Sequence, residues 1–73
     1  MSLGYRIASM RGYRRLTQGE LGARIGVAKQ TVCNWENGTS RPNVDLIRAI
    51  CIAIDCSADY LLELTDNPIR RSE

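Results

Sequence analysis

The sequence predicts an all-α fold, a compact bundle of five helices without a strand. Two observations predict it: apolar residues recur at helical spacing in successive segments, and residues that cap or stop helices lie between those segments. The chain has 73 residues, enough for one small domain around one core. We expect residues 1–66 to form that domain and residues 67–73 to form a flexible tail, because the Asn67-Pro68 step stops a helix.

The first helix is expected over residues 3–13. Leu3, Ile7 and Met10 stand at positions i, i+4 and i+7, so they form one apolar stripe. A short basic link follows, from which Leu16 is expected to pack into the core.

The second helix is expected to begin after Thr17, its N-cap. Glu20 stands three residues on and completes a capping box, in which the hydroxyl and the carboxylate each satisfy one backbone amide. Leu21 and Ile25 mark the buried face. Gly26 ends the helix, because glycine takes the positive φ of a helix terminus without strain.

The third helix is expected over about residues 28–36, with Val32 and Trp35 facing the core. The Asn37-Gly38 step stops it and opens a loop that runs to Pro42. Two short amphipathic helices around a glycine-centred turn have the sequence form of a helix-turn-helix. The second helix of such a motif can enter the major groove of DNA.

The fourth helix is expected to begin after Asn43, its N-cap, and to end at Asp55 in a left-handed conformation. Its apolar positions give the strongest periodicity in the chain: Ile47, Ile50, Cys51 and Ile54. Ser57 is then expected to cap a fifth helix that runs through Leu64. The inward side chains of that helix are expected to be Tyr60, Leu61 and Leu64.

Charge is distributed unevenly along the chain. Residues 1–41 hold seven basic and two acidic side chains, a balance of +5, whereas residues 42–73 hold three basic and six acidic ones, a balance of −3. The basic half coincides with the helix-turn-helix, which favours a phosphate-binding surface on one side of the molecule. A solvated surface of uneven charge is the alternative.

Composition also indicates which chemistries to exclude. Three cysteines without a CxxC motif, and no histidine, argue against a metal site and against a disulfide framework. They favour a reducing, cytoplasmic setting. No membrane-spanning segment, signal peptide, cofactor or small-molecule ligand is expected from the sequence.

The chain resembles the phage repressor and Cro type of helix-turn-helix proteins, also called the XRE family, over about residues 7–64. Four motifs at the usual spacing carry the resemblance: Gln-x-Glu-Leu at 18–21, Gly26-Val27, Trp35-Glu36-Asn37-Gly38 and Arg41-Pro42. The resemblance implies a lambda-repressor-like bundle of five helices that binds operator DNA, usually as a homodimer, and regulates transcription. Two residues depart from the family pattern: Gly22 replaces alanine, and Ala28 replaces a serine or threonine cap.

The face of the third helix opposite Val32 and Trp35 is expected to read bases. It presents Ala28, Lys29, Gln30, Cys33 and Asn34. Lys29 can donate to guanine O6 and N7, Gln30 or Asn34 can pair with adenine, and Ala28 can contact a thymine methyl group. The alternative is a plain solvated helix face, and Asn34 has phosphate binding as a further alternative.

Other contacts are implied by the resemblance. Gln18, at the N-terminus of the second helix, is expected to bind a phosphate and to buttress Gln30. The loop after the third helix is expected to lie on the DNA backbone through Asn37, Gly38, Ser40 and Arg41. Three further arginines either steer DNA without ordered contacts or are plain exposed charges: Arg14, Arg15 and Arg24.

Arg11 and Glu36 match a pair that forms a structural ion pair between the first and third helices of the family. The fifth helix and its flanks supply the dimer contact in relatives, which makes Cys56 and Leu62 the candidates here. Leu62 could equally be an isolated exposed leucine.

Two other functions are compatible with this fold: a protein-interaction module that no longer binds DNA, and an antitoxin that acts through a protein partner. An enzyme is not expected, because the chain has no histidine, no paired-carboxylate site and no glycine-rich phosphate loop.

Overall fold

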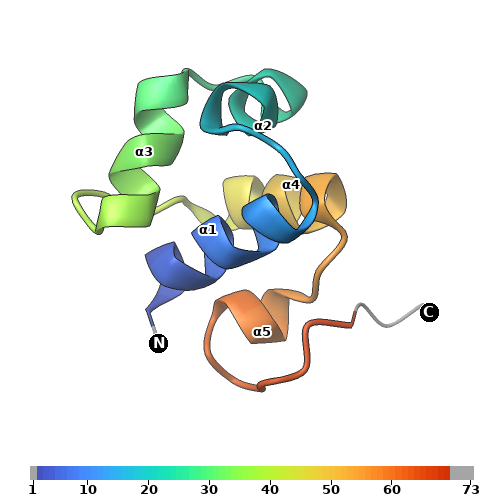
Figure 1. The fold of residues 1–73 in the computed structure, drawn as a ribbon. Helices are drawn as coiled ribbons and strands as arrows, with labels where there is room; N and C mark the ends of the chain where they lie inside the picture. The colour runs from blue at the N-terminus through green and yellow to red at the C-terminus, as the bar shows by residue number, and fades with distance from the viewer. Residues whose placement is uncertain (1, 70–73) are drawn as a thin grey trace.

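The computed structural model describes residues 2–69, and within them the chain forms five helices and no strand (Figure 1). The helices are α1 (Leu3–Tyr13), α2 (Gln18–Ile25), α3 (Lys29–Asn37), α4 (Val44–Ile54) and α5 (Ala58–Leu61). Figure 1 shows α2 and α3 at one end of the molecule, α5 at the other, and α1 and α4 between them. The predicted all-α, five-helix architecture is confirmed. Within residues 2–69, no helix is long and apolar enough to cross a membrane.

One core joins all five helices. Its buried apolar side chains are Leu3, Ile7, Met10, Leu16, Leu21, Val32, Trp35, Ile50, Cys51, Ile54, Cys56, Tyr60 and Leu61. The predicted stripe of the first helix and the inward position of Leu16 are both found here. Ile25 and Ile47, also predicted to face inward, are half-buried and pack against this cluster.

The helix ends follow the local chemistry of the sequence. The Thr17 hydroxyl accepts from the Glu20 amide at 3.0 Å, and the Glu20 carboxylate accepts from the Thr17 amide at 2.8 Å. The bond from the Thr17 amide holds the pKa of Glu20 below its usual range. Asn43 caps α4 through the Leu46 amide, and Asp55 ends α4 at φ 51° in the left-handed region. These predicted caps are confirmed.

The start of α3 lacks a side-chain cap. Ala28 holds the extended N-cap conformation, but its methyl group accepts no hydrogen bond, so the helix begins at Lys29. It ends at Asn37, where Gly38 takes φ 83°. Both ends lie one residue beyond the predicted ones. The missing cap costs about 1 kcal/mol relative to serine or threonine.

The fifth helix is shorter than predicted. It ends at Leu61, because Glu63 adopts φ 67° and turns the chain out of the helix. The Glu63 amide donates to the Tyr60 carbonyl at 3.1 Å, and the Leu64 amide donates to the Asp59 carbonyl at 2.8 Å, a Schellman-type ending. Leu64 is consequently 73% exposed, so the prediction that it faces the core is wrong.

Arg6 is a buried cation that joins α1 to the chain after α5. Its guanidinium donates to the carbonyl oxygens of Tyr60 at 2.8 Å and Thr65 at 2.6 Å, and it pairs with Asp66 at 3.0 Å. It also lies 4.4 Å from the centre of the Tyr60 ring. The buried charge is therefore compensated by two carbonyl oxygens and by the Asp66 carboxylate.

The segment that follows is also attached to α5. The Ser57 amide donates to the Pro68 carbonyl at 2.9 Å, and the Ser57 hydroxyl donates to the Asn67 carbonyl at 3.3 Å. Residues 67–69 thus lie against the start of α5. The rest of the tail predicted to be flexible, residues 70–73, lies outside the described residues.

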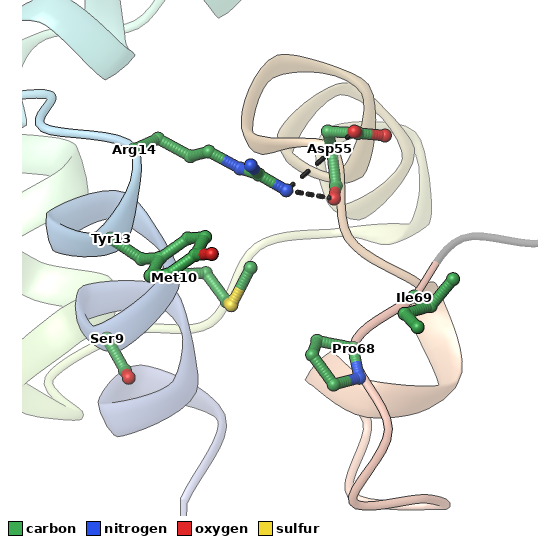
Figure 2. Close-up of a pocket in the computed structure, with 7 residues that line it drawn as sticks. All are labelled: Ser9, Met10, Tyr13, Arg14, Asp55, Pro68 and Ile69. Carbon is green, nitrogen blue, oxygen red and sulfur yellow. Dashed lines mark hydrogen bonds and ion pairs between the residues drawn. The ribbon is translucent and has the colours of Figure 1, made fainter.

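Arg14 makes ordered contacts within the protein, at the C-terminus of α4. Its guanidinium donates to the Ile54 carbonyl oxygen at 2.8 Å. It also donates to the Asp55 carbonyl oxygen at 3.0 Å and lies 3.7 Å from the Asp55 carboxylate (Figure 2). The last carbonyls of a helix lack intrahelical partners and attract cations. Arg14, which directly follows α1, therefore binds the carbonyl oxygens at the C-terminus of α4.

Two glycines permit close approach between backbones. A Cβ atom on Gly4 would meet the carbonyl oxygens of Trp35 and Glu36, the latter at 2.7 Å, and one on Gly22 would meet the Val27 carbonyl oxygen at 2.6 Å. In contrast, a Cβ on Gly12 meets nothing within 4 Å. The packing of α1 on α3, and of α2 on the turn before α3, thus depends on missing side chains.

This difference predicts opposite effects of two alanine substitutions in α1. Gly4→Ala should lower the free energy of unfolding by about 1–3 kcal/mol, because a methyl group is forced against backbone oxygens. Gly12→Ala should raise it by about 0.5–1 kcal/mol, because alanine is the better helix former. Urea unfolding followed by circular dichroism measures both, and equal effects of the two substitutions would contradict this close approach of α1 to α3.

Candidate nucleic-acid interface

Residues 18–37 form a helix-turn-helix. Gly26 takes φ 79° after α2, and the Val27 amide donates back to the Gly22 carbonyl at 2.9 Å, which closes the turn. Leu21 of α2 and Val32 of α3 are both fully buried in the same core. The turn and the core together fix the angle at which α3 leaves α2.

The predicted base-reading residues lie together on the outer side of α3. Ala28, Lys29 and Gln30 are exposed, and Cys33 and Asn34 are half-buried. On the opposite side of the helix, Val32 and Trp35 are buried, as predicted. The surface of α3 therefore carries a strip with one basic side chain, Lys29, and two amides, Gln30 and Asn34. These groups can form the hydrogen bonds that base edges require.

Two of these side chains are bonded to each other. The Gln30 amide nitrogen Nε2 donates to the Asn34 oxygen Oδ1 at 2.9 Å. Residues four apart on a helix face one another, so this bond is local to the exposed strip. It orients both amides before any partner arrives.

Gln18 stands at the first position of α2, where the backbone amides and the helix dipole favour an anion. Its Nε2 donates to Glu36 Oε1 at 3.0 Å. The expected support of Gln30 by Gln18 is therefore absent in this state, because each amide has a different partner. Instead, Gln18 ties the start of α2 to the end of α3.

The predicted phosphate-binding loop is exposed and ordered by its own hydrogen bonds. Its four candidates, Asn37, Gly38, Ser40 and Arg41, all lie at the surface. The Asn37 side chain accepts from the Thr39 amide at 2.9 Å, and the amides of Thr39 and Ser40 both donate to the Asn34 carbonyl. The loop is thereby held directly beside the C-terminal end of α3.

Arg11 and Glu36 form the ion pair implied by the family resemblance. Arg11 Nε lies 2.6 Å from Glu36 Oε2, and the terminal nitrogens reach Glu36 Oε1 at 3.0 Å and the Leu16 carbonyl at 2.6 Å. The Glu36 side chain is only 8% exposed. Hydrogen bonding to Glu36 raises the pKa of Arg11 above its usual value, although burial opposes this shift.

The two dimer candidates differ in position. Cys56 is fully buried, so the prediction that it forms a surface contact between two copies is wrong. Hydrogen bonding to Cys51, together with burial, raises the pKa of its thiol. The family resemblance proposed Cys56 because it flanks the fifth helix, but in the turn before α5 its side chain points into the core. Leu62 is 46% exposed.

Leu62 belongs to an apolar groove that the sequence reasoning did not predict. The groove runs between α4 and α5, and its exposed lining is Val44, Arg48, Ile52, Ala58, Asp59 and Leu62. The signal in the sequence was the spacing of Val44, Arg48 and Ile52, four residues apart on one side of α4.

Within residues 2–69, no group of three residues is placed to hold a metal ion.

Comparison with known proteins identifies relatives of most of the helical region. The family model "Helix-turn-helix" matches residues 7–61. Repressor protein C2 of Salmonella phage P22 is 34% identical over 61 residues, which cover 84% of this chain and 28% of that protein. YobD of Bacillus subtilis, an uncharacterized HTH-type transcriptional regulator, is 33% identical over 63 residues, 86% of this chain and 56% of that protein.

A solved structure agrees with these relatives. The crystal structure of the P22 c2 repressor in complex with a synthetic operator superposes with a TM-score of 0.80 at 33% identity, and the match covers 84% of this chain and 92% of that one. The chain matches only 28% and 56% of the length of the two curated relatives above.

Because Glu36 is buried, removal of its partner Arg11 should cost more free energy of unfolding than removal of an exposed arginine. Arg11→Met should lower the free energy of unfolding by about 3 kcal/mol or more, because it leaves a carboxylate inside the protein without its cation. Arg24→Met, at an exposed position, should change it by less than about 0.5 kcal/mol. The double variant Arg11→Met/Glu36→Met should be more stable than Arg11→Met alone. Denaturant unfolding tests this order, and equal losses in Arg11→Met and Arg24→Met would disprove it.

Proposed function

This chain belongs to the helix-turn-helix family, and we propose that it is a transcriptional regulator that places α3 in the major groove of a palindromic operator. The exposed strip on α3, with Lys29, Gln30 and Asn34 opposite a buried face, is the observation that carries this proposal. It is supported by the P22 c2 repressor, a relative of similar fold in complex with operator DNA. Since that relative is a repressor, repression is the favoured mode of regulation.

Each residue of the strip has a role that its chemistry supports. Lys29 donates to guanine, Gln30 and Asn34 present amides to base edges, and Ala28 and Cys33 offer small contacts to thymine methyl groups. Residues near the N-terminus of a recognition helix reach farthest into the groove, which favours Lys29 and Gln30 as the principal readers.

Phosphates are bound on both sides of the recognition helix. Gln18 and the free amides at the start of α2 form one site, and the loop after α3 forms the other, with Asn37, Gly38, Ser40 and Arg41. These contacts fix the position of α3 on the duplex without selecting a sequence. The ordered geometry of the loop favours this role, because little conformational freedom is lost on binding.

Other functions receive less support. A protein-interaction module that no longer binds DNA would favour acidic or bulky apolar groups on the outer face of α3, which instead carries a lysine and two amides. The same groups suit binding and not catalysis. Operator binding implies a cytoplasmic site of action for the protein.

We infer a symmetric homodimer that forms through the groove between α4 and α5. Val44, Ile52 and Leu62 supply its exposed apolar surface, and Arg48 and Asp59 lie at the same groove with opposite charges. A two-fold axis that passes through the groove would pair Arg48 of one copy with Asp59 of the other, and the reverse, which would make this surface complementary to itself. Two copies then present two α3 helices to half-sites about 34 Å apart.

Selection of random duplexes by the purified protein tests the proposed function. At about 150 mM salt, nonspecific attraction is damped, so enrichment reports base contacts. We expect an inverted repeat with half-site centres about one helical turn, ~34 Å, apart. A folded protein that enriches no sequence would contradict operator binding and favour a protein partner instead.

The proposed dimer predicts that two nearby leucines respond differently to a charge. Leu62→Glu should weaken binding to a duplex with two half-sites by at least about tenfold, or about 1.4 kcal/mol, because a carboxylate must enter the apolar contact. Binding to a single half-site should be unchanged. Leu64→Glu, at an exposed position that does not line the groove, is the matched control and should bind both duplexes normally.

Sedimentation of each variant bound to the two-half-site duplex measures the number of protein copies. At protein concentrations below saturation of a single half-site, one copy for Leu62→Glu and two for Leu64→Glu is the expected result. Two cooperative copies for both variants would place the dimer contact elsewhere on the molecule.

A further inference from the structure

The hydrogen bond between Gln30 and Asn34 limits which base Gln30 can read. A primary amide has two N–H bonds and one carbonyl oxygen. In this structure Gln30 Nε2 already donates one hydrogen to Asn34 Oδ1, at 2.9 Å. One N–H and the oxygen Oε1 remain for a partner, side by side on the same edge of the amide when the bond to Asn34 uses the hydrogen that points away from Oε1.

That remaining edge matches adenine and not guanine. Adenine presents an acceptor, N7, next to a donor, N6–H, so one N–H and one oxygen of the glutamine satisfy both. Guanine presents two acceptors, N7 and O6, so a bidentate contact requires both hydrogens of Nε2. With one hydrogen bonded to Asn34, Gln30 cannot make that contact, and Oε1 would be turned toward a guanine acceptor.

We propose that Asn34 is a positioning residue that makes Gln30 selective for adenine over guanine in the major groove. This inference rests on the proposed function, because it names the base that the same site recognises. Asn34 acts through its acceptor oxygen, and its own amide nitrogen is left to donate to a neighbouring base or phosphate. The two residues thus read DNA as one unit, with the preference at the Gln30 position dependent on a side chain that does not touch that base.

The surroundings of the pair support this role. Asn34 is half-buried, and its carbonyl accepts from the amides of Thr39 and Ser40, so its backbone is held by the loop after α3. Gln30 is exposed and lies one turn nearer the end of the helix that enters the groove. A half-buried acceptor, Asn34, therefore orients the more exposed Gln30.

The test uses the operator obtained by selection, with the base pair read by Gln30 identified as the one whose preference is lost in Gln30→Ala. At that position the wild-type protein should prefer adenine over guanine by about tenfold or more, the discrimination of one good bidentate pair. Asn34→Ala removes the acceptor and should reduce this ratio to about threefold or less, mainly because guanine is bound better. Asn34→Asp keeps an oxygen acceptor, so it should retain the ratio even if its charge weakens binding to every sequence.

Thr31→Ala is the matched control on α3, since Gln30 donates to Asn34 and not to Thr31, and Thr31 is not one of the proposed base-reading residues. It should leave the ratio of adenine to guanine binding unchanged. Thermal unfolding of each variant shows whether it is folded, and the ratio, unlike the affinity, is insensitive to a partial loss of folded protein.

Two results would overturn the inference while leaving operator binding intact. The first is a wild-type preference for guanine at the Gln30 position. The second is an adenine preference that survives in Asn34→Ala, which would show that Gln30 selects its base without help. If no sequence is enriched in the first place, the proposed function and this inference both fail.

Discussion

The buried carboxylate of Glu36 joins the three helices on which the candidate interface depends. Arg11 from α1 binds it through two nitrogens, and Gln18 from α2 binds it through one, while Glu36 itself belongs to the last turn of α3. A carboxylate removed from water needs such compensation, so its partners cannot separate without a large cost. α3 is thereby anchored at its C-terminal end, and its N-terminal end stays exposed for the groove of a duplex.

Glycine sets how closely the helices around this anchor can approach. The backbone of α1 lies against the carbonyl oxygens at Trp35 and Glu36 only because Gly4 has no side chain. Gly22 plays the same part toward Val27, so the alanine that the family prefers at this position would force the turn of the helix-turn-helix to shift here. A glycine that weakens α2 as an isolated helix therefore tightens the motif, and tertiary packing outweighs local propensity.

Features set by a few neighbouring residues could be predicted from the sequence. The capping box at Thr17, the cap at Asn43 and the left-handed Asp55 all depend on groups within four positions. The end of α5 could not, because a glutamate takes the left-handed conformation there without a residue that signals it. The buried role of Arg6 was also missed, since its partners lie 54 to 60 residues away and no local pattern marks them.

For the candidate site, too, part could be predicted from the sequence and part could not. Its location follows from periodicity, because burial of Val32 and Trp35 leaves only one face of α3 exposed. What that face offers does not follow, because each amide has several possible partners within the chain: Gln18 bonds Glu36, and Gln30 bonds Asn34. An amide hydrogen that is already bonded within the protein is unavailable to a base. The hydrogen bonds among the surface side chains therefore set part of the base specificity of the site. The exposed residues therefore define which donors and acceptors the surface contains, whereas the hydrogen bonds among them determine which of these groups remain available to a base.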